Sequence, residues 1–196
     1  VLGDLGVGYV GDKLTARVGV RRQEAVTEHY NLNTLLEEIR TNDVFAEAIY
    51  RTKGEKFLER WQLEAFLEAG QFTDDNQRLR VVGRVLHNGI EKPKRHLKYG
   101  LAVRHQAYKE DSRYYFSPAD YTGLGPIFRY DYRADAFFSF GATGTAYYIF
   151  QVDEWDLSAG GYVGRQLTES SRLYLRIDYG ESTLDDDEIR AISGLA

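Results

Sequence analysis

The sequence predicts an all-β protein, an antiparallel transmembrane β-barrel, from three observations. Apolar and polar residues alternate with a period of two over most of the chain, which is the spacing of strands that face two different environments. The connections between these segments alternate between short and long, which is typical of barrels with tight turns at one end and longer loops at the other. Aromatic residues make up 14% of the chain and gather near segment ends, like the interfacial girdles of membrane barrels.

About eleven strands are expected, in a barrel of about 11–12 visible strands that forms a single domain over residues 1–196. The clearest segments span 13–23, 57–69, 77–87, 97–108, 124–133, 136–149, 154–165 and 171–180. Weaker segments span 2–10, 43–52 and 188–196.

The alternating connections assign a side to each end of the strands. The periplasmic side is assigned the connections at 11–12, 53–56, 88–96, 133–135 and 167–170. Of these, 88–96 is intermediate in length and the others are short. The longest outside loop, 24–42, contains a short helical candidate, Asn33 to Arg40, in which Asn33 serves as an N-cap or only as a local loop cap. If 11–12 is periplasmic, closing an even-stranded barrel requires an upstream strand, so a chain truncated at its N-terminus is expected.

The two faces keep the same sense from strand to strand. In residues 13–21, for example, Leu14, Val18 and Val20 alternate with Arg17 and Arg21. The polar register is expected to line the lumen, through Arg17, Arg21, Arg60, Glu64, Glu68, Arg80, Arg84, Arg104, Arg129, Asp131, Arg172 and Arg176. Basic residues exceed acidic ones in this register, which predicts a lumen that leans positive and favours anions.

The net charge of −5 is then expected to come largely from acidic outside loops. Such loops either hold divalent cations next to lipopolysaccharide phosphates or are simply solvated.

Several classes of function are excluded by what the sequence lacks. No apolar run reaches the roughly 20 residues that a membrane helix needs. The chain has no Cys and only four scattered His, which argues against thiol chemistry and a metal site. His105 lies in the apolar register, where an interfacial or ladder-paired role is expected, and the glycines of 3–11 do not complete a dinucleotide fingerprint. No enzymatic activity, cofactor or nucleic-acid partner is therefore expected.

Two short stretches carry a resemblance to a known family. Gln71-Phe72-Thr73-Asp74-Asp75-Asn76 follows one strand, and Tyr115, Phe116, Ser117, Pro118 and Tyr121 precede another. Together they resemble the C-terminal outer-membrane barrels of bacterial exopolysaccharide exporters of the cellulose synthase type, over residues 70–179. Each stretch alone is also ordinary turn chemistry. Two departures from the family, the missing helical repeats and the missing terminal aromatic residue, again predict a fragment.

The resemblance implies a bacterial outer-membrane channel that exports a polysaccharide without covalent chemistry. Its implied partners are outer-membrane lipid, lipopolysaccharide and a periplasmic tetratricopeptide scaffold. The positive lumen adds the expectation that the polymer is anionic.

Two alternatives stay open at the level of sequence. One is a structural or anchoring barrel plugged by ion pairs, such as those of Arg60 or Arg80 with Glu64 or Glu68. The other is a soluble barrel that carries an apolar ligand, in which the apolar register would point inward.

Overall fold

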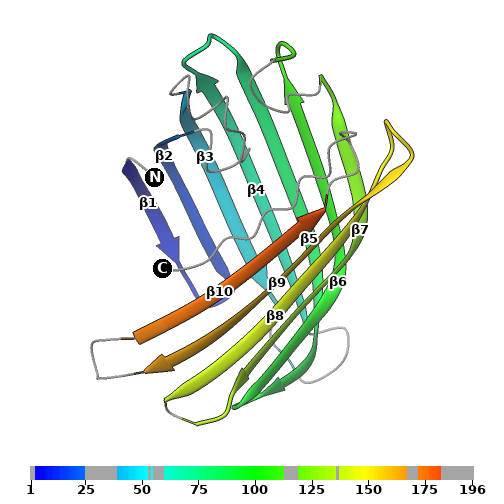
Figure 1. Cartoon of the computed structure of the whole chain (residues 1–196). Coiled ribbons are helices and arrows are strands. Elements are labelled where there is room, and N and C mark those ends of the chain that lie inside the picture. Colours follow the sequence, from blue (N-terminus) through cyan, green and yellow to red (C-terminus); the bar gives the residue numbers. More distant parts are fainter. Residues whose placement is uncertain are drawn as a thin grey trace. The chain divides into compact units, whose positions relative to one another are not determined.

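The computed structural model is a ten-stranded sheet in which every strand lies next to its neighbours in sequence, from β1 to β10 (Figure 1). The structure describes residues 3–24, 39–52, 54, 60–112, 119–135, 137–166 and 172–181. Pairing is antiparallel between β1 and β2, β2 and β3, β8 and β9, and β9 and β10. This simple up-and-down order leaves β1 and β10 as the edge strands of the sheet.

The strand bounds are β1 Gly3–Val10, β2 Leu14–Glu24, β3 Arg40–Arg51, β4 Trp61–Phe72, β5 Gln77–Lys92, β6 Arg95–Tyr108, β7 Tyr121–Arg133, β8 Phe138–Ile149, β9 Glu154–Gln166 and β10 Arg172–Glu181. They correspond one by one to the predicted segments, apart from 188–196, which lies outside the described residues. The helical candidate also lies outside them over 33–38, and Arg40 opens β3. Within the part of the chain that is described, no helix is long and apolar enough to cross a membrane.

One predicted connection, 88–96, is wrong. Strand β5 continues to Lys92, and β6 begins at Arg95, so the turn between them is short. The dipeptide Asn88-Gly89 has the composition of a turn, but here both residues belong to the strand. A Cβ on Gly89 would lie 2.5 Å from a ring carbon of Tyr99. The glycine therefore makes room for an aromatic ring on the neighbouring strand, not for a change of direction.

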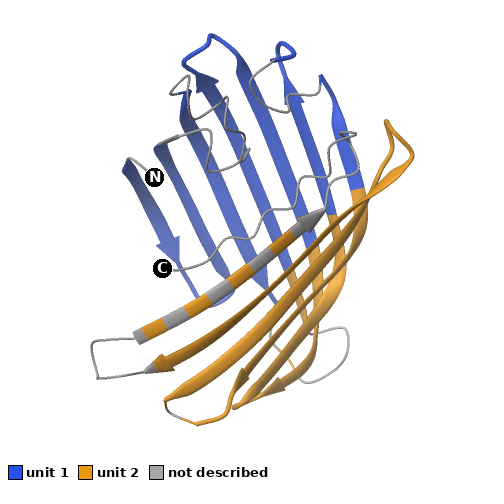
Figure 2. Ribbon diagram, in the orientation of Figure 1, with its two compact units in different colours: residues 1–53, 63–84, 103–123 blue, residues 54–62, 85–102, 124–196 orange. Residues whose placement is uncertain are grey.

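The chain divides into two compact units (Figure 2). Unit 1 comprises residues 1–53, 63–84 and 103–123, and unit 2 comprises 54–62, 85–102 and 124–196.

In both units most of the large apolar side chains of the strands lie on the exposed face. In unit 1, Leu67 is 48% exposed whereas the adjacent Glu68 is 0% exposed. In unit 2, Leu101 is 56% exposed whereas the adjacent Ala102 is 1% exposed. A soluble barrel buries its apolar face and exposes its polar face, so the soluble-carrier alternative is wrong. The exposed apolar face is the one that a membrane barrel presents to lipid.

Aromatic residues that are exposed or half-buried gather near the ends of the unit 2 strands, as the girdle pattern predicted. The ring of Tyr148 lies 5.6 Å from those of Phe150 and Trp155 at one end of β8 and β9. At the other end, the ring of Tyr132 lies 5.0 Å from that of Phe140. Such amphipathic clusters are typical of the level at which membrane and water meet.

Candidate functional site: the polar face of the strands

The polar face of unit 1 is organised around a fully buried carboxylate, Glu68. It accepts hydrogen bonds from Arg78 at 2.6 Å, from Arg80 at 3.2 Å and from Arg21. A second buried carboxylate, Asp43, lies 3.6 Å from Arg21 and 3.5 Å from Arg78. These five residues, from strands β2 to β5, form what we call the Glu68 cluster.

A glycine makes this cluster possible. A Cβ on Gly70 would clash with a carboxylate oxygen of Asp43, so any larger residue would displace that side chain. The hydroxyl of Thr41 donates a hydrogen bond of 3.0 Å to the other oxygen of Asp43. Buried charges are tolerated only when they are paired and hydrogen-bonded in this way.

Three further ion pairs extend the polar face of unit 1. Arg84 donates to Glu64 at 3.0 Å, and the Glu64 side chain is only 9% exposed. Arg17 lies 2.6 Å from Asp4 and 3.9 Å from Glu47, and both of these pairs are open to solvent. The exposed pairs contribute little to stability because water screens them.

At the end of unit 1 where β4 and β6 finish, the polar face gives way to a small apolar cluster. Ile39, Phe72 and Tyr108 are buried to within 5% exposure and form a small core, in which the rings of Phe72 and Tyr108 are 5.8 Å apart. The side chain of Asn76 donates to the Glu110 carbonyl at 2.8 Å and accepts from its N–H at 3.0 Å. This amide clamp ties the connection after β4 to the one after β6.

In unit 2 the polar face carries neutral and mixed pairs. Lys98 donates to Gln62 at 2.8 Å, and the hydroxyl of Tyr162 donates to Asp131 at 2.7 Å. His87 is 5% exposed, and its ring lies 5.1 Å from that of Trp61 and 5.4 Å from that of Tyr99.

The stretches that carried the family resemblance fall partly within the described residues. Tyr115, Phe116, Ser117 and Pro118 lie outside them. Tyr121 begins β7 and is 4% exposed. Its hydroxyl accepts a hydrogen bond from Arg104 at 2.5 Å, and the guanidinium group lies 4.6 Å from the centre of its ring. In the other stretch, Asp75 adopts a left-handed φ of 66°, which suits an Asp in a tight turn.

For the remaining predicted lining residues, the structure gives backbone contacts, burial or strand register. The carbonyl of Arg60 accepts a hydrogen bond of 2.8 Å from the N–H of Asn88, and Arg129 is half-buried in β7. Arg172 and Arg176 lie on β10 with a backbone register opposite Gln166 and Tyr162, and their side chains are outside the described set.

The predicted lining omitted two members of the Glu68 cluster, Arg78 and Asp43. Arg78 shares the register of Arg80 and Arg84, so the alternation alone contained the signal. Asp43 belongs to a segment whose alternation is weak, and its face becomes clear only through its pairing with Arg21 across β2 and β3.

Comparison with known proteins identifies the family. The family model described as the cellulose synthase operon protein C C-terminus matches residues 49–167, which is more than half of the chain. The chain belongs to this family. No curated protein matches the chain.

The fold of this chain is also similar to that of a solved structure. A structure described as a bacterial polysaccharide outer membrane secretin matches with a TM-score of 0.73 and 14% sequence identity. The match covers 96% of this chain and 65% of the other chain. The family and the fold together place this chain in the bacterial outer membrane as a transmembrane β-barrel, as the sequence predicted.

Proposed function

We propose that this chain is the outer-membrane conduit part of a polysaccharide exporter and acts without covalent chemistry. The observation that carries the proposal is a polar face of charged and hydroxyl side chains in a member of the cellulose synthase operon protein C family, opposite an exposed apolar face. Such side chains replace the water contacts of a hydrated polymer as it moves.

The charge balance of the proposed lining supports weak ion selectivity. In unit 1, ion pairs on the polar face join five arginines to five carboxylates: Arg17, Arg21, Arg78, Arg80 and Arg84 with Asp4, Asp43, Glu47, Glu64 and Glu68. Within this network of unit 1, basic and acidic side chains are therefore equal in number, and the positive excess that the sequence indicated is smaller there. An uncharged polymer therefore suits this face at least as well as the anionic one that was expected from residue counts.

The proposed surroundings follow from the two faces and two ends of the strands. Outer-membrane lipid contacts the apolar face, and lipopolysaccharide surrounds the end with the longer loops. A periplasmic tetratricopeptide scaffold would deliver the polymer to the end with the short turns.

A second candidate is a structural barrel with a closed interior. The buried Glu68 cluster and the apolar core of Ile39, Phe72 and Tyr108 favour it, because both fill space on the polar face.

Planar-bilayer recordings on the full-length protein separate the two candidates. The exporter predicts discrete conductance steps that a soluble oligosaccharide reduces when it is added on the periplasmic side. Complete absence of conductance, in protein that shows the heat-modifiable gel migration of a folded barrel, would establish the closed structural barrel instead.

A further inference from the structure

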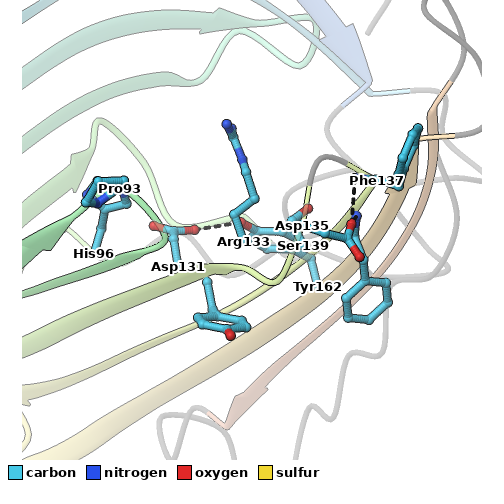
Figure 3. A pocket seen from close by; sticks show the side chains of 10 residues that line it. Pro93, His96, Asp131, Arg133, Asp135, Phe137, Ser139 and Tyr162 are labelled. Carbon is cyan, nitrogen blue, oxygen red and sulfur yellow. Dashed lines mark hydrogen bonds between the residues drawn. The ribbon is translucent and has the colours of Figure 1, made fainter.

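Unit 2 contains a pocket of about 300 Å³ beside its short turns (Figure 3). Its lining comes from the turn between β5 and β6, from the start of β6, from both sides of the turn between β7 and β8, and from β9. The polar and aromatic side chains that line it include His96, Asp131, Asp135, Phe137, Ser139 and Tyr162.

Two lining residues of this pocket, Tyr162 and Asp131, are brought together by a glycine on the strand between them. Tyr162 of β9 pairs in register with Gly141 of β8, and its hydroxyl reaches Asp131 of β7 at 2.7 Å. A Cβ on Gly141 would clash with the ring of Tyr162 and would lie 2.9 Å from a carboxylate oxygen of Asp131. Only glycine allows the ring to span the intervening strand, so the aromatic surface and the carboxylate are held together.

The rim of the pocket is fixed by backbone hydrogen bonds. Asp135 accepts bonds of 2.7 Å from the N–H groups of both Phe137 and Phe138. The neighbouring turn is attached to it, because the N–H of Arg133 donates to the Lys94 carbonyl at 2.9 Å and the Lys94 ammonium donates to the Ala134 carbonyl at 3.0 Å. Phe137 is left 63% exposed at this rim. A preformed site of this kind loses less entropy when a ligand binds.

The chemistry of the lining matches a sugar. Carboxylate, tyrosine hydroxyl, serine hydroxyl and imidazole groups supply acceptors and donors for several hydroxyls, and the aromatic rings supply apolar surface for the carbon face of the ring. Two carboxylates, Asp131 and Asp135, line the pocket, and the Arg133 side chain extends away from them (Figure 3). A ligand that carries its own carboxylates would therefore be repelled.

We propose that this pocket is an entry subsite that binds an uncharged, hydroxyl-rich saccharide. The inference rests on the proposed export function, which places the short turns at the periplasmic end where a polymer would enter. Binding there is weak, with a Kd of about 1 mM, because a conduit has to release each unit as the chain advances.

The test is calorimetric titration of the full-length protein in detergent with a neutral glucose hexasaccharide and with a uronic-acid hexasaccharide. The neutral probe is expected to bind, and the uronic-acid probe to bind at least about tenfold more weakly because of like-charge repulsion. Asp131→Ala should weaken the neutral probe at least about tenfold, since it removes charge-assisted hydrogen bonds. Asp131→Asn should strengthen binding of the uronic-acid probe, a gain that misfolding cannot produce.

Asp153→Asn provides the matched control. Asp153 accepts a hydrogen bond from Tyr148, so it repeats the tyrosine–carboxylate pair outside the pocket, and its substitution should change neither affinity. Neutral binding that is absent, or unchanged in Asp131→Ala, would overturn the subsite. Tighter wild-type binding of the uronic-acid probe would overturn its selectivity. Conductance of the same preparation reports on the channel independently, so a conducting protein without saccharide binding would refute this subsite alone.

Discussion

At the scale of single residues, Glu68 holds the polar face of unit 1 together. Its carboxylate is fully buried and is bonded to three arginines from two other strands. Removing one partner of a buried ionic group leaves the other charges desolvated and uncompensated, which costs much more than the lost attraction itself. Loss of the Glu68 carboxylate should therefore destabilise the protein much more than loss of the exposed Glu47 carboxylate on the same face.

Glu68→Ala should lower the free energy of unfolding by about 3–5 kcal/mol. The matched control is Glu47→Ala, which removes a solvent-open carboxylate 3.9 Å from Arg17 and should cost less than about 1 kcal/mol. Urea titrations of protein refolded into lipid vesicles measure both. Similar losses for the two variants would show that Glu68 is not the centre of the network.

Arg84 is a residue for which the structure changes the expectation. The alternation alone predicts that Arg84→Leu has only a small effect on stability, because it places the side chain on a water-filled face. The guanidinium is bonded to a Glu64 that is 9% exposed, so the substitution should destabilise the barrel by about 1–3 kcal/mol. The double variant Arg84→Leu with Glu64→Leu should recover part of that loss; no recovery would mean that the pair is not coupled.

At the scale of the strand, the exposed apolar register makes a direct prediction about lipid. Leu101→Arg places a cation on a mid-strand position that is 56% exposed, and it should cost about 2–4 kcal/mol at the membrane midplane. Leu101→Met keeps the volume and polarity of the side chain and should cost less than about 1.5 kcal/mol. Equal stability of the two variants in lipid vesicles would contradict the orientation of β6.

The corrected turn between β5 and β6 also has a stability test. Gly89→Val would drive a side chain into the ring of Tyr99 and should cost about 1–3 kcal/mol. Gly161 is a suitable control, because a Cβ there would make only an ordinary contact at 3.5 Å. If 88–96 were a loop, Gly89→Val would be tolerated as well as Gly161→Val.

Strand positions and faces followed from period two, since burial of one register is a local property of each strand. The side-chain contacts between strands could not be predicted in the same way. The Glu68 cluster joins residues far apart in sequence, so its membership depends on the register between strands, which alternation does not specify. The pocket beside Asp131 was missed for a related reason. It depends on Gly141 lying beneath Tyr162, and in the sequence an isolated glycine indicates only an interruption of a strand.

At the scale of the whole molecule, a member of the cellulose synthase operon protein C family has an exposed apolar face and a polar face whose charges are paired. We expect the polar face to meet water and the moving polymer, and the apolar face to meet lipid. The chain contains no Cys, so a single introduced thiol reports on one position without interference. Adjacent residues of β9 offer a matched pair, with Leu157 on the apolar face and Ser158 on the polar face.

The most direct measurement is the conductance of full-length Ser158→Cys and Leu157→Cys in planar bilayers while a charged, water-soluble thiol reagent is added. The account predicts a stepwise fall in conductance for Ser158→Cys, because the modified side chain narrows the path, and no change for Leu157→Cys, because lipid shields it. Block through Leu157→Cys with none through Ser158→Cys would contradict the assignment of the two faces.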